Sequence, residues 1–100
     1  MVAEDDQLYR FGTEIEDANK LEGDCERALP KGFPYGVSVR SVSNRSDASV
    51  AKRSEVELYF MVRKTGQDPH HFTIEMPHPV TLEAAESFNR LFGRTGERNG

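Results

Sequence analysis

Residues 55–76 constrain the fold more than any other part of the sequence. Apolar and polar residues alternate there in two runs, and a period of two is the pattern of a strand with one buried face. A turn-rich segment, residues 65–69, separates the runs, so the sequence predicts an antiparallel β-hairpin. The apolar members are Val56, Leu58, Phe60 and Val62 in the first run, and Phe72, Ile74 and Met76 in the second.

Two amphipathic helices and two further strands are expected around this hairpin. Apolar residues recur at helical spacing over residues 16–29 and again over 82–92, where Thr81 is placed as the N-cap and Gly93 as the C-cap. Strands are predicted over residues 8–13 and 35–39, a polar loop over 41–47, and a short helical turn over 47–53. The sequence therefore predicts an α+β domain of order β-α-β-β-β-α, with a mainly antiparallel sheet of about four strands and two helices on one face.

The length of 100 residues, without an internal repeat or a long linker, predicts a single domain over residues 1–100. We expect an ordered core over about residues 8–93 and flexible ends over 1–6 and 94–100, where apolar anchors are scarce. No apolar run approaches the roughly 18 residues of a membrane span, and no leader pattern opens the chain. With one cysteine, Cys25, an internal disulfide is excluded, and we expect a cytoplasmic protein.

Two surfaces are candidates for binding another protein. The first predicted helix presents an anionic stripe that could dock a basic partner through electrostatic steering. The stripe consists of Glu16, Asp17, Glu22, Asp24 and Glu26. On the hairpin, Tyr59 and Met61 are predicted to face away from the helices beside Arg63, and exposed Tyr and Met among charges are typical of a contact patch.

These surfaces predict a small non-catalytic protein-binding module that uses the acidic helix and the exposed sheet face. We expect another protein as the partner, by its charge a basic one, and no cofactor. The general profile is similar to that of adaptors, bacterial immunity proteins and phage-encoded inhibitors.

A first alternative is an enzyme. An arginine on the first predicted strand (Leu8-Tyr9-Arg10), a serine-containing strand end (Ser41-Val42-Ser43) and a glutamate on the last strand (Glu75) follow one another in the chain. This order resembles ADP-ribosyltransferase-like bacterial toxins, although the central threonine of their serine motif is valine here. The resemblance implies an enzyme acting on NAD, in which Arg10 would neutralise the diphosphate, Ser41 would mark the strand end of the site, and Glu75 would steady the oxocarbenium-like ribose.

A second alternative is the binding of single-stranded nucleic acid. Residues 40–64 hold six Lys and Arg against three carboxylates, and Tyr59 lies among them. An exposed aromatic ring beside cations can stack on a base. The net charge of −4 disfavours general binding to a phosphate backbone, so nucleic acid is not the expected partner.

Histidine and cysteine give little indication of a chemical site. His70 and His71 are adjacent, so on a strand they would point to opposite faces, and His78 lies between two prolines. No CxxC or HxxxH spacing is present, and the sequence predicts no metal site beyond these three weak candidates. Cys25 falls on the apolar stripe of the first predicted helix, which predicts a buried thiol and not a nucleophile.

Overall fold

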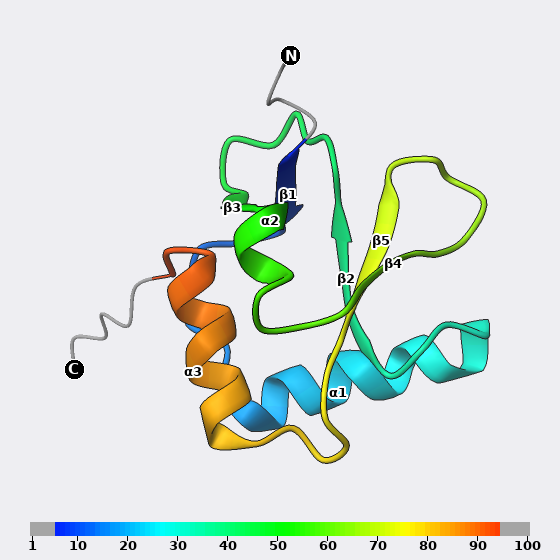
Figure 1. Ribbon diagram of the computed structural model, residues 1–100, viewed down its shortest axis with the longest axis vertical. Coiled ribbons are helices and arrows are strands. Elements are labelled where there is room, and N and C mark those ends of the chain that lie inside the picture. Colours follow the sequence, from blue (N-terminus) through cyan, green and yellow to red (C-terminus); the bar gives the residue numbers. More distant parts are fainter. Residues whose placement is uncertain (1–5, 95–100) are drawn as a thin grey trace.

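The computed structural model describes residues 6–94, which form a five-stranded antiparallel sheet and three α-helices (Figure 1). The elements in chain order are β1 (Gln7–Arg10), α1 (Ala18–Ala28), the 3₁₀ turn η2 (Leu29–Lys31), β2 (Gly36–Arg40), β3 (Ser49–Lys52), α2 (Arg53–Val56), β4 (Val62–Lys64), β5 (His71–Glu75) and α3 (Leu82–Leu91). The strand order in the sheet is β3-β1-β2-β5-β4, and every neighbouring pair is antiparallel. The predicted α+β class is confirmed.

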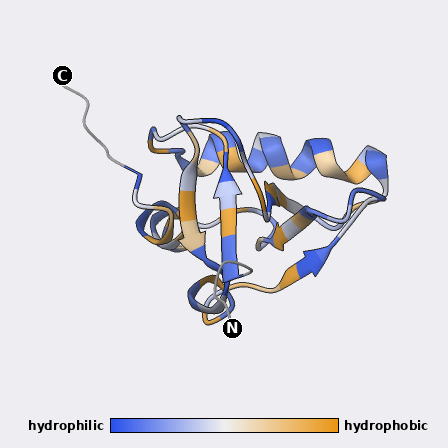
Figure 2. Cartoon of the chain, turned by 90° about the horizontal axis from the view of Figure 1, so that it is seen from above, coloured by the Kyte–Doolittle hydropathy of each residue, from blue (hydrophilic) through white to orange (hydrophobic). Residues whose placement is uncertain are grey.

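The core lies on one face of the sheet. Residues that are partners across neighbouring strands share a face, and Val37 pairs with Ile74, which in turn pairs with Val62. These three residues belong to the same buried cluster as Leu21 of α1 and Phe88 of α3. Both long helices therefore cover the same face, as predicted. A helix with one side on the core needs both kinds of residue, and Figure 2 shows hydrophobic and hydrophilic residues alternating along the long helix α1.

Side-chain caps fix where the two long helices begin. The Asp17 carboxylate accepts a hydrogen bond from the backbone N–H of Lys20 (2.9 Å), and the Thr81 hydroxyl accepts one from that of Ala84 (3.0 Å). After α3, Gly93 has a φ of 61°, the left-handed conformation that glycine adopts at low cost. The predicted N-cap at Thr81 is confirmed.

The predicted hairpin is confirmed only in its second half. β5 pairs with β4, but β4 begins at Val62, and the strand predicted from Val56 onward is wrong. Residues 53–60 instead form α2 and the turn that follows it, in which the N–H of Phe60 donates to the carbonyl of Val56 (2.9 Å). Leu58 is consequently 77% exposed and not part of the core.

The helical turn predicted over residues 47–53 is also wrong. Residues 49–52 form β3, which pairs with β1 along its whole length at the edge of the sheet. Burial alternates along it, with Ser49 and Ala51 buried and Val50 and Lys52 exposed. Because the buried positions carry Ser and Ala and an exposed position carries Val, hydropathy does not follow burial here, and the sequence does not show the strand.

Two residues expected in the flexible ends are ordered. The Asp6 carboxylate accepts hydrogen bonds from the N–H (3.0 Å) and the hydroxyl (2.9 Å) of Ser54, and the Arg94 side chain is only 2% exposed. The other residues of those ends, 1–5 and 95–100, lie outside the described residues. Within residues 6–94, no helix combines the length and the apolar content needed to cross a bilayer.

Candidate functional site

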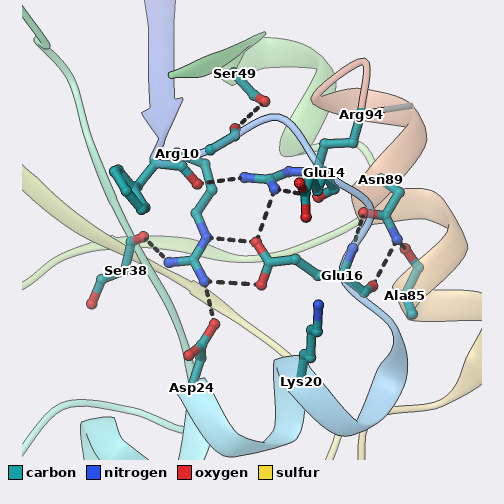
Figure 3. A network of polar contacts seen from close by, with 12 residues as sticks. Arg10, Glu14, Glu16, Lys20, Asp24, Ser38, Ser49, Ala85, Asn89 and Arg94 are labelled. Carbon is teal, nitrogen blue, oxygen red and sulfur yellow. Dashed lines mark hydrogen bonds and ion pairs between the residues drawn. The ribbon is translucent and has the colours of Figure 1, made fainter. Parts of the chain in front are cut away.

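Arg10 is the centre of a partly buried ionic network between the sheet and α1 (Figure 3). Its guanidinium donates to both carboxylate oxygens of Glu16 (3.1 and 3.2 Å), to Asp24 and to the carbonyl of Ser38 (2.9 Å). Burial alone would lower the pKa of Arg10, but hydrogen bonding and attraction to Glu16 and Asp24 raise it above its ordinary value. The donors of Arg10 are thus largely used within the protein.

Arg94 and Asn89 fasten the segment before α1 to the end of α3. The Arg94 guanidinium pairs with Glu16 (3.1 Å) and donates to the carbonyls of Glu14 (2.7 Å) and Phe11 (3.1 Å). The Asn89 amide accepts from the N–H of Glu16 (3.0 Å) and donates to its carbonyl (2.9 Å). Burial lowers the pKa of Arg94 below its ordinary value, because the shared carboxylate of Glu16 does not fully replace lost hydration.

The anionic stripe expected on α1 is not a free surface. Glu16 and Asp24 are taken up by arginines of the network. The Asp17 carboxylate caps α1, and that of Glu22 accepts from the N–H of Val80 (3.1 Å). Of the five carboxylates, Glu26 alone has no such contact with the described residues.

The three residues of the NAD alternative do not come together. Ser41 follows the end of β2, whereas Glu75 pairs with Gly36 at the start of that strand. Five residues of extended strand separate them by roughly 16 Å along the sheet. Glu75 is paired with Arg63, and the Ser41 hydroxyl lies 3.1 Å from Nδ1 of His70. No shared site for NAD is formed by these groups.

The arginines of residues 40–64 are matched by carboxylates. The ion pairs are Arg40–Asp68 (2.7 Å), Arg45–Asp47 (3.1 Å), Arg53–Glu57 (3.0 Å) and Arg63–Glu75. The Lys64 ammonium donates to two backbone carbonyls. The arginines that give residues 40–64 their positive charge are therefore paired within the protein, which weakens the argument that this region binds nucleic acid.

The histidines and the cysteine lie in separate places. His71 contacts Thr65, whereas the ring of His78 stacks on Tyr35 with centroids 4.0 Å apart, beyond the opposite end of β5. Among residues 6–94, no three His, Cys, Asp or Glu side chains are grouped to hold a metal. Cys25 is buried as predicted, and mainly its burial raises the thiol pKa to about 12.

An exposed apolar patch lies where the predicted strand gives way to turns. We define the apolar patch as Tyr59 and Met61, each 56% exposed and both at one groove; Leu58 (77%) and Leu82 (69%) are exposed as well. Tyr59 and Met61 line one wall of a shallow groove of about 350 Å³, and the first turns of α3, from Thr81 to Ser87, line the other. The alternation predicts Leu58 on the buried face, and Leu82 begins the apolar stripe predicted over residues 82–92, but both side chains are exposed. Leu82 is exposed because it is the first residue of α3, directly after the cap.

One free carboxylate lines this groove, and two more lie on α2 and α3. Across the described part of the chain, five carboxylates have no side-chain hydrogen bond or ion pair: Glu14, Glu26, Glu55, Glu83 and Glu86. Three of them, Glu55, Glu83 and Glu86, lie on α2 and α3, helices that contact each other (Figure 1). Glu83 lines the groove itself, together with the Arg63-bound Glu75. The exposed side chains of Tyr59 and Met61 and the unpaired carboxylate of Glu83 therefore line one groove.

Comparison with known proteins gives no further guide to the site, since no protein-family model, no curated protein and no solved structure matches this chain significantly.

Proposed function

We propose that this protein is a small protein-binding module whose partner contributes a cationic segment with a large apolar side chain. The binding surface in this proposal is the groove between residues 59–61 and the first turns of α3. The partner's apolar side chain lies between the apolar patch and α3, and its cations pair with Glu83, Glu86 and Glu55. One observation carries the proposal: the exposed side chains of Tyr59 and Met61 line the same groove as the unpaired carboxylate of Glu83.

Physical chemistry supports this choice of surface over α1. Burying exposed Tyr and Met side chains contributes about 25 cal/mol per Å² of apolar surface removed from water. Unpaired carboxylates attract a cation without first giving up an internal partner, whereas Glu16 and Asp24 would have to break ion pairs. The net charge of −4 adds a long-range attraction for a basic partner.

The proposal places the protein in the cytoplasm. Its single cysteine is a buried thiol, which is compatible with a reducing compartment.

Peptide display tests this function with an unbiased set of partner sequences. A random peptide library is selected on the wild-type protein, and enriched sequences are titrated against wild type and the Tyr59→Ser/Met61→Ser variant. We expect the enriched peptides to combine Lys or Arg with an aromatic or large aliphatic residue. The variant should bind them at least about tenfold more weakly, as expected for anchor residues of an interface.

The matched control is Val42→Ser/Val50→Ser, which removes two exposed apolar side chains that do not line the groove. Its affinity should equal that of wild type. Peptides that bind the Tyr59→Ser/Met61→Ser variant as tightly as wild type would refute this surface, provided that the variant's circular dichroism spectrum is unchanged.

A further inference from the structure

A second concave site lies over the Arg10 network, apart from the groove at α3. It is an open cleft of about 880 Å³ between residues 10–16 and α1, and Arg94 contributes to its wall. Sites for small molecules commonly measure roughly 300–1,000 Å³ and combine apolar walls with a few polar groups. The cleft therefore has the dimensions for a small-molecule ligand.

The ionic network beneath this cleft carries more positive than negative charge. Three guanidinium groups, those of Arg10, Arg27 and Arg94, share the two carboxylates of Glu16 and Asp24. An arginine without a carboxylate of its own in a partly buried site leaves an excess positive potential. That potential favours an anion in the cleft.

Lys20 adds a free cation to the same cleft. Its side chain extends from α1 toward the network (Figure 3), and within residues 6–94 its ammonium has no carboxylate within 4 Å. Two further carboxylates line the cleft: Asp47, which Arg45 already neutralises, and Glu14, which is exposed and unpaired. When Arg45, which pairs with Asp47 and lies over Phe11, is counted with the lining residues, five cations face four carboxylates, an excess of one positive charge.

Apolar side chains complete the lining. Phe11 and Ile15 are both exposed and both face the cleft. The guanidinium of Arg45 lies over the Phe11 ring, 4.1 Å from its centroid, which helps to hold the ring in place. An exposed aromatic ring and a free ammonium in the lining of one cleft suit a ligand that has both a flat apolar part and a negative charge.

We propose that this cleft binds a small organic anion. Its carboxylate or phosphate group pairs with Lys20 in the positive field of the arginine network, and its flat apolar part lies against Phe11 and Ile15. This site is independent of the proposed protein-binding groove, because the two share no lining residue.

Titration calorimetry of the full chain with three probes tests the proposal: benzoate, phenyl phosphate and benzyl alcohol. We expect at least one of the two anions to bind with a millimolar or lower Kd, and the tighter one identifies the preferred anionic group. Binding should weaken about fivefold in Lys20→Gln, as for the loss of one charge-assisted contact. It should weaken similarly in Phe11→Ala.

Lys31→Gln is the matched control, since Lys31 is an exposed lysine of η2 that does not line the cleft. Its affinity should be that of wild type. The proposal is overturned if neither anion binds, if neutral benzyl alcohol binds as tightly as the anions, or if Lys20→Gln and Lys31→Gln behave alike. Both lysines are exposed, so folding is not expected to change in either variant.

Discussion

Asn89→Ala is expected to destabilise the protein by about 2–4 kcal/mol, because it removes both backbone contacts that α3 makes with Glu16. Asn89 is buried, and its amide satisfies the N–H and the carbonyl of Glu16 across 73 residues of chain. A partly buried backbone group left without a partner costs about 1–3 kcal/mol, and two are orphaned here. Solvent near the Glu16 side chain offsets part of this loss.

The measurement is urea denaturation followed by circular dichroism, with the free energy of unfolding extrapolated to water. Asn19→Ala is the matched control, because Asn19 is exposed on α1 and alanine is a better helix former. That control should change stability by less than about 0.5 kcal/mol. Equal effects of the two substitutions would refute the claim that Asn89 fastens α3 to the segment before α1.

Three further predictions concern single positions. Gly36→Ala should lower the free energy of unfolding by about 1–3 kcal/mol, since a Cβ there would lie 2.2 Å from the Ile74 carbonyl oxygen. A thermal melt should show a lower melting temperature, and an unchanged one would contradict this packing. Gly23→Ala should raise the free energy of unfolding by about 0.5–1 kcal/mol, since the new Cβ would meet only the end of the Arg27 side chain, at 3.7 Å. A lower melting temperature would contradict this expectation. Because burial raises the Cys25 pKa from 9.0 to about 12, unfolding releases a thiol that ionises more readily, and stability should fall as the pH rises above about 9. Urea midpoints at about pH 8 and pH 10 should differ more for wild type than for Cys25→Ala, and equal differences would disprove the linkage.

Helical spacing with a capping residue, and strict apolar–polar alternation, correctly predicted a helix and a strand. The stripe over residues 82–92 with its Thr81 cap corresponds to α3, and the alternation over 72–76 to β5. The alternation that starts at Val56 did not predict α2, whose first turn contacts a distant residue. Asp6, 48 residues away, binds the N–H and hydroxyl of Ser54 at the start of α2, and no local pattern contains that contact.

The candidate site was predictable only in part for the same reason. Tyr59 and Met61 are exposed as expected, although Tyr59 lies in a turn and Met61 directly before β4, not on a strand. The acidic stripe was visible in the sequence, but its neutralisation by Arg10 and Arg94 depends on the tertiary fold. Counting charges along a chain shows where carboxylates are, and their partners in the fold decide which of them are free.

The most direct test of the protein-binding proposal compares two charge variants with one display-selected cationic peptide, by titration calorimetry at low salt. Glu83→Gln/Glu86→Gln removes free carboxylates beside the groove, and Glu14→Gln/Glu26→Gln removes an equal number elsewhere. We predict that the first variant binds about five- to thirtyfold more weakly, as for two lost ion pairs of about 0.5–1 kcal/mol each, and that the second binds like wild type. Equal affinities of the two variants, or a loss confined to Glu14→Gln/Glu26→Gln, would contradict the assignment of the binding surface to α3.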